Sequence, residues 1–130
     1  MGYAFALSGP ETRALFDLPA PPQGPGLPAA PARPGRFTSA GARRLMWFGR
    51  ARWLLMAPLA EEPALAAALA PAGAELWSDA LCFFRLTGPD AAVALAVACP
   101  LDLHPRAFGP DAVAWSDAFG TRALVLREGA

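Results

Sequence analysis

The chain has 130 residues and a formal net charge of zero, with eleven arginines, no lysine and eleven acidic residues. A neutral chain with scattered arginines lacks the basic surface that binds nucleic acid, and its longest apolar run, within residues 91–101, is about half a membrane span. We therefore expect no nucleic-acid partner and no membrane span. The length suits one compact domain over residues 1–130.

The remaining totals concern the surface and the cellular compartment. Hydrophobic residues make up 55% of the chain and charged residues only 17%, so we expect apolar surface that a partner covers. The two cysteines, Cys82 and Cys99, follow apolar residues and predict buried free thiols in a reducing, cytoplasmic setting. The N-terminus lacks the basic region and the long apolar run of a signal peptide.

The first third of the chain predicts a strand, an arm and a hairpin. A short strand is expected at residues 4–7. Residues 18–35 hold seven prolines and three glycines, and because proline donates no backbone hydrogen bond, they predict an irregular arm along this domain or a neighbour. Residues 43–49 and 52–58 are aromatic-rich apolar runs two residues apart, a spacing typical of a β-hairpin.

A helix is predicted over residues 60–73. Pro63 is tolerated in its first turn, where acidic residues also suit the helix dipole, and Pro71 with Gly73 ends it. Leu65 and Leu69 lie one turn apart and predict a stripe that faces the core.

A second strand and helix follow. Residues 81–86 predict a strand that runs directly into a helix, and Pro100 ends that helix. Thr87 and Asp90 have the spacing of a capping box at the helix start.

The last predicted element is a second hairpin, residues 112–119 and 121–127, with Gly120 at its turn. Strands therefore outnumber the two helices, which argues against regular alternation of strands and helices. The order predicts an α+β fold in which two helices pack on one face of a largely antiparallel sheet.

The segment CPLDLHPRAF, at residues 99–108, contains the only histidine of the chain. Asp102 and His104 are two residues apart, so in an extended segment their side chains share a face that Cys99 could approach. Three such residues without a CxxC or HxxxH partner make a weak metal site. We therefore expect no metal-binding residue in this chain.

Nucleophilic catalysis and nucleotide binding have little support. Ser78 or Ser116 could serve an Asp–His dyad as nucleophile, but no GxSxG elbow frames either serine. The glycines of residues 18–35 are surrounded by prolines, which lack the N–H groups that bind phosphate. We therefore expect no catalytic and no cofactor-binding residue here.

The remaining interpretation of CPLDLHPRAF is a conformationally locked loop. Its prolines preset the backbone path, and Asp102 can accept backbone N–H bonds as aspartates do in turns. His104 can bridge two acceptors, so that Arg106 and Phe108 project from a rigid frame. Arginine and an aromatic residue on a stiff loop are typical of a protein–protein interface.

The sequence of residues 43–127 resembles the gamma subunit of heterotetrameric sarcosine oxidase. The resemblance rests on LMWFGRARWLLMAP near its start, on Arg85, Leu86 and Gly88–Ala91, and above all on Cys99–Phe108, where ten consecutive residues match. It implies a fold like the aminomethyltransferase-type folate-binding domain. It also implies a complex whose larger subunits bind FAD, FMN and NAD and pass a one-carbon unit to tetrahydrofolate, while the gamma subunit itself holds no cofactor.

Three departures from the family pattern stand out. The family often has an aspartate in place of Leu76 and tends to have a glutamine in place of Trp115. It also usually continues with another strand and a C-terminal helix beyond the point that corresponds to Ala130. The resemblance therefore predicts a C-terminally shortened relative, or one that a partner completes.

Two functions stay open at this point. The first is a non-catalytic gamma subunit that assembles with alpha, beta and delta subunits into a complex that demethylates sarcosine oxidatively to glycine. Its expected interface anchors are aromatic or arginine residues on hairpins and loops: Trp47, Phe48, Arg106, Phe108 and Trp115. The second is a free-standing folate or small-ligand binder, for which Glu61, Glu62 and Glu75 are the available carboxylates.

Overall fold

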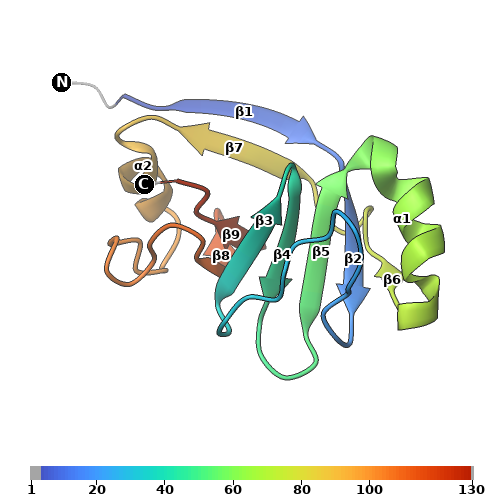
Figure 1. Cartoon of the computed structure of the whole chain (residues 1–130). Helices are drawn as coiled ribbons and strands as arrows, with labels where there is room; N and C mark the ends of the chain where they lie inside the picture. Colours follow the sequence, from blue (N-terminus) through green and yellow to red (C-terminus); the bar gives the residue numbers. More distant parts are fainter. Residues whose placement is uncertain (1–3, 130) are drawn as a thin grey trace. The chain divides into compact units, whose positions relative to one another are not determined.

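The computed structural model describes residues 4–129, which group into two compact units. Unit 1 combines the residues up to Pro10 with those from Phe83 onward, and unit 2 spans Glu11–Cys82. The described residues form mostly antiparallel strands and two α-helices, so the predicted α+β class is confirmed (Figure 1). The strands divide among three sheets, and the two helices belong to different units. The single domain expected over residues 1–130 stays a prediction.

Unit 2 is built on a five-stranded antiparallel sheet in the order β3-β4-β5-β2-β6. Its strands are β2 (Arg13–Leu18), β3 (Arg36–Ala40), β4 (Arg43–Trp47), β5 (Trp53–Pro58) and β6 (Glu75–Leu76). The β4–β5 pair confirms the predicted hairpin, whereas β2, β3 and β6 go beyond the prediction. Strand β5 is the middle strand and buries five of its six residues, and β2 beside it buries four of its six.

Helix α1 (Glu62–Leu69) packs on one face of this sheet, between single 3-10 turns at Leu59–Glu61 and Ala70–Ala72. Leu65 and Leu69 are buried, which confirms the predicted stripe. They share a core cluster with alternate residues of three strands: Ala14, Phe16, Leu18, Leu45, Trp53, Leu55 and Ala57. Gly73 adopts a left-handed conformation with φ of 82° directly after the last turn, and so ends the helical segment as predicted.

The proline-rich arm contains no helix or strand after Leu18 and before Arg36, as predicted. It lies along unit 2 itself, because three of its prolines (Pro22, Pro28 and Pro31) are buried and Leu27 packs against the core cluster. The hydroxyl of Thr38 on β3 donates a hydrogen bond to the carbonyl of Ala29 in the arm. Packing therefore orders this segment without a backbone ladder.

Unit 1 begins with a two-stranded ribbon formed by β1 (Ala6–Glu11) and β7 (Phe83–Thr87), whose arrows run in opposite directions in Figure 1. Two glycines allow the close approach of the strands. A Cβ atom on Gly9 would lie 2.7 Å from the carbonyl oxygen of Phe83, and one on Gly88 would lie 2.7 Å from that of Ala4. Both glycines have positive φ, at 115° and 109°, a region that side chains disfavour.

Helix α2 (Ala91–Ala96) follows the ribbon and is shorter than predicted. The predicted capping box is wrong, because the Asp90 side chain makes no hydrogen bond to the helix start. Asp90 instead fastens β1: its carboxylate accepts a hydrogen bond from the Ala4 N–H at 2.7 Å, and its own N–H donates to the Ala4 carbonyl at 3.1 Å. A residue expected to start a helix thus joins two segments 86 positions apart.

The second predicted hairpin is confirmed as β8 (Val113–Ala118) and β9 (Thr121–Leu126), with Phe119 and Gly120 in left-handed conformations at the turn. Among the described residues, none of the helices is long and apolar enough to span a membrane.

Asp17 on β2 provides a test of the sheet through pH. Burial raises the pKa of its carboxyl, and the negative charge of Glu75, its neighbour across the β2–β6 pair, raises it further, whereas Arg52 lowers it. Because its pKa is higher in the folded state, the folded chain binds more protons than the unfolded chain just above pH 3.8, so the ionised carboxylate weakens the fold at neutral pH. Asp17→Asn should raise the melting temperature at pH 7 by about 1–3 °C and change it little at pH 3. An equal gain at both pH values would contradict this assignment.

Candidate functional site

The loop at residues 99–108 is locked by hydrogen bonds among its own residues. Asp102 Oδ1 accepts from the His104 N–H at 3.0 Å, which is the turn predicted for this aspartate. His104 Nδ1 accepts from the Arg106 N–H at 3.2 Å, and the His104 carbonyl accepts from the N–H groups of Ala107 and Phe108. Each of these polar side chains therefore shapes the backbone of the next few residues.

An apolar cluster fixes the underside of the loop. Leu103, Phe108 and Ala112 are buried together. The prediction that Phe108 projects from the frame is wrong: the residue is only 5% exposed, because its ring fills the space beneath the loop. Arg127, which follows β9, donates from Nη2 to the Leu103 carbonyl at 3.0 Å and ties the loop to the hairpin.

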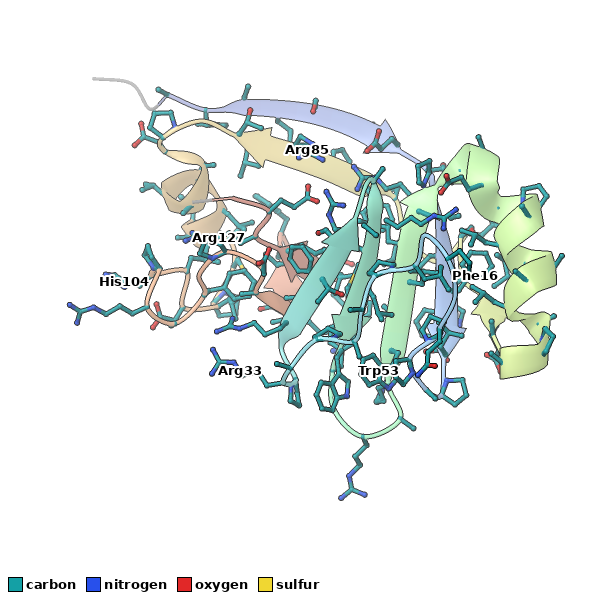
Figure 2. The ribbon with its side chains drawn as sticks, in the orientation of Figure 1. Phe16, Arg33, Trp53, Arg85, His104 and Arg127 are labelled. Atoms are coloured by element: carbon teal, nitrogen blue, oxygen red, sulfur yellow. The ribbon has the colours of Figure 1, made fainter. Side chains whose placement is uncertain are left out.

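The polar side chains of the loop face outward. Asp102, His104 and Arg106 are all exposed, and Figure 2 shows His104 on the outer side of the loop. In its neutral form His104 carries its proton on Nε2, since Nδ1 is an acceptor. The arrangement presents one imidazole and one guanidinium on a stiff frame. The hydrogen bonds of Asp102 and His104 go to backbone N–H groups of the loop, so both side chains help to fix its shape.

The residues considered for nucleophilic or metal chemistry have other surroundings. Ser78 is buried, and its hydroxyl accepts a hydrogen bond from the Leu15 N–H at 3.1 Å, which makes it part of the β2 framework. Cys99 is buried as predicted, with Sγ at 3.7 Å from the Ser116 hydroxyl. Within residues 4–129, no group of three or more His, Cys, Asp or Glu side chains could hold a metal ion. The prediction of a buried Cys82 is wrong, because that residue, the last of unit 2 in the sequence, is exposed.

The other expected interface anchors lie on the two hairpins. The Trp47 ring stacks on that of Trp53, with centroids 4.8 Å apart and planes 3° from parallel, so it is only partly exposed. Phe48, which follows it directly, is also partly exposed. The Arg122 guanidinium on β9 lies 5.1 Å from the centre of the Trp115 ring on β8. Their role at an interface stays a prediction.

The carboxylates needed by a folate binder do not gather in one place. Unit 2 has an open hollow of about 600 Å³ lined by Gly26, Gly41, Arg43, Glu61 and neighbouring residues. Glu61 there forms an ion pair with Arg43 at 2.9 Å. Glu75 lies on β6 beside Asp17, away from the lining of this hollow. A pterin that used Glu61 in this hollow would have to compete with Arg43 for its carboxylate.

Sequence reasoning missed the exposed apolar residues of unit 1. Phe5, Leu7 and Phe84 on or beside the β1–β7 ribbon are 47%, 64% and 56% exposed. The signal was present in Gly9 and Gly88, because a glycine within or beside a strand often marks a close approach of two backbones.

The loop geometry predicts that His104→Gln is tolerated. Glutamine keeps a donor and an acceptor in place of the imidazole, so we expect a change in unfolding free energy below about 1 kcal/mol. Asp102→Ala should cost more, about 1–2 kcal/mol, because it removes the acceptor that holds the turn. Urea denaturation of the full chain measures both values, and a larger loss for His104→Gln would contradict the backbone role assigned here.

Comparison with known proteins points in one direction. No family model and no curated protein matched the chain. A search of solved structures matched it with a TM-score of 0.71 and 25% identity over 96% of its length to heterotetrameric sarcosine oxidase from Corynebacterium sp. U-96, in complex with pyrrole 2-carboxylate. This chain is similar to a subunit of sarcosine oxidase. The alignment covers 71% of the sarcosine oxidase chain, so part of that longer chain has no counterpart in these 130 residues.

Proposed function

We propose that the chain is the non-catalytic gamma subunit of a heteromeric sarcosine oxidase and supports assembly of the flavoprotein complex. The observation that carries the proposal is the structural match, which extends over nearly the whole chain. The matched enzyme is a heterotetramer, so the expected partners of this chain are the other subunits of such an enzyme. In the sequence, the unbroken CPLDLHPRAF segment agrees with a gamma subunit rather than another one.

The distribution of apolar surface supports an assembly role. Among residues 4–129, six of the eight exposed large hydrophobic residues belong to unit 1, the smaller unit: Phe5, Leu7, Phe84, Val93, Val97 and Phe119. All six residues of β1 are exposed, although the strand is held in place by Asp90 and two close glycine contacts. An isolated two-stranded ribbon is marginally stable in water, and this one exposes apolar side chains. We therefore expect a partner to cover it.

Within such a complex this chain would have a structural role and no catalytic one. FAD, FMN and NAD would be bound by the alpha and beta subunits, where sarcosine would be oxidised, and the complex would pass the one-carbon unit to tetrahydrofolate. The prolines of residues 18–35 leave few N–H groups for a phosphate, and the loop side chains bind the backbone. The chain would supply the exposed ribbon and the rigid loop at residues 99–108.

Copurification tests this proposal. The tagged full chain should capture larger proteins from its native source, and these should show a flavin absorption spectrum and sarcosine-dependent oxygen uptake. We expect the interface in this complex to bury more than roughly 2,000 Å², as in obligate complexes. Leu7→Ser with Phe84→Ser should abolish capture without unfolding the chain, because both side chains are already exposed. The matched control is Leu76→Ser on β6, where the leucine is 54% exposed.

The opposite result is equally clear. A chain that sediments as a monomer at high concentration and ignores flavin-bearing proteins would overturn the gamma-subunit proposal and favour the free-standing binder.

A further inference from the structure

Four arginines gather at one end of the unit 2 sheet, and we call this group the arginine end: Arg33, Arg36, Arg50 and Arg52. The turn between β4 and β5 holds Arg50 and Arg52. Arg36 begins β3 directly opposite Trp47, the last residue of β4, and Trp47 in turn pairs with Trp53. Figure 2 shows Arg33 at the same end of the sheet as Trp53.

This end of unit 2 has an excess of positive charge. Residues 11–82 contain seven arginines and six acidic residues, so placing four arginines together leaves the rest of the unit acidic. The described ion pairs of unit 2 involve Arg13 and Arg43, whereas none of the described acidic side chains forms an ion pair with the arginine end. Arg52 lies near Asp17, and its positive charge partly offsets the rise in the pKa of that carboxyl caused by burial and Glu75. Arg33, Arg50 and Arg52 are exposed, and Arg36 is half-buried.

The backbone beneath these arginines is rigid. The stacked Trp47 and Trp53 rings close the end of the hairpin, and the Trp47 indole N–H donates to the Arg50 carbonyl at 3.3 Å. The Phe48 N–H donates a hydrogen bond to the Arg52 carbonyl at 2.9 Å across the turn. Arg50 has φ of 49°, in the left-handed region that a non-glycine residue rarely adopts. The structure thus holds an arginine where a glycine or asparagine would fit the backbone better.

We propose that the arginine end is a docking surface for a carboxylate-rich surface of another subunit of the complex. Guanidinium groups pair with carboxylates through two parallel hydrogen bonds, and a fixed backbone lowers the entropy lost on binding. A nucleic acid fits less well, because the net charge of the chain is zero and the other acidic residues of unit 2 would repel a long polyanion. This inference rests on the proposed function for the identity of the partner, but not for the chemistry of the surface.

The chemistry is tested with defined probes on the full chain. Fluorescence anisotropy would measure binding of a labelled poly-glutamate peptide and, separately, of a labelled single-stranded RNA of equal charge. Arg50→Gln with Arg52→Gln should weaken peptide binding about five- to tenfold, because two of the four charges are lost. The matched control, Ala64→Glu with Ala67→Glu at exposed positions of α1, changes the net charge equally and should leave binding within about twofold. Arg50→Lys with Arg52→Lys should retain part of the affinity. Lysine keeps the positive charge but lacks the planar guanidinium, which donates two parallel hydrogen bonds to one carboxylate.

The outcomes separate the two proposals. Three results would each overturn the docking surface. They are an equal loss of peptide affinity in the glutamine pair and the control pair, no peptide binding at all, and tighter binding of the RNA than of the peptide. Capture of the flavin-bearing subunits that is unaffected by the glutamine pair would overturn it too, while the proposed function would stand. If no such subunits are captured, the proposed function fails, and the peptide result still decides what the arginine end binds.

Discussion

Gly88→Ala is expected to separate strand β1 from β7 and to lower the free energy of unfolding by about 2–3 kcal/mol. The added methyl group would lie 2.7 Å from the Ala4 carbonyl oxygen and 2.9 Å from the Phe5 Cα, so the backbone of the ribbon has to move. Its φ of 109° adds a cost that only glycine avoids. Hydrogen exchange should show the loss at the Asp90 amide, which donates to Ala4, together with a lower urea midpoint.

Gly120→Ala is the matched control for this substitution. Gly120 also has a positive φ, of 77°, but a Cβ there meets nothing within 4 Å. Only the conformational cost of about 1 kcal/mol should appear. Equal losses for the two variants would show that backbone conformation, and not the close approach of β1, explains the need for Gly88.

Phe108→Ala is expected to have a comparable or larger effect, about 3–4 kcal/mol, because it empties the space beneath the loop at residues 99–108. The ring is 5% exposed and packs with Leu103 and Ala112, and no other aromatic residue belongs to this cluster. The hydrogen bonds from Ala107 and Phe108 to His104 should then exchange faster, since the cavity frees the turn that they close. Chemical denaturation and hydrogen exchange measure the two effects.

Val97→Ala serves as the control for Phe108→Ala. Val97 is 84% exposed, so its loss should change the free energy of unfolding by less than about 0.5 kcal/mol. If Phe108→Ala were as mild as this control, the loop would owe its shape to its prolines and Asp102 alone.

Local patterns predicted the elements that depend on local physics. Leu65 and Leu69 showed the face that helix α1 buries, and Gly120 showed the turn between β8 and β9. The Asp102 turn was also predicted, because an aspartate in a turn commonly accepts the N–H of the residue two positions later, here His104. Each of these features is decided within a few residues of the chain.

The features that were missed depend on residues far apart in the sequence. Asp90 has the spacing of a helix cap, yet its carboxylate bonds to Ala4, and no local pattern reports a partner 86 positions away. The arginine end shows the same difficulty: Arg36 and Arg50 look scattered until the pairing of β3 with β4 brings them to one edge. Phe108 was taken for a surface residue, because a loop has no regular periodicity that shows which side an aromatic ring faces.

The interrupted arrangement of unit 1 has a consequence for synthesis on the ribosome. Strand β1 is made first, but its partner β7 begins 72 positions after β1 ends, once the whole of unit 2 has been translated. At typical rates of elongation, roughly 4–15 s pass between the synthesis of β1 and the start of β7, and β1 has no partner strand during that time. During that interval Phe5 and Leu7 are open to chaperones and to neighbouring nascent chains. The yield of correctly folded chain should therefore depend on how quickly unit 2 folds and leaves β1 free to meet β7.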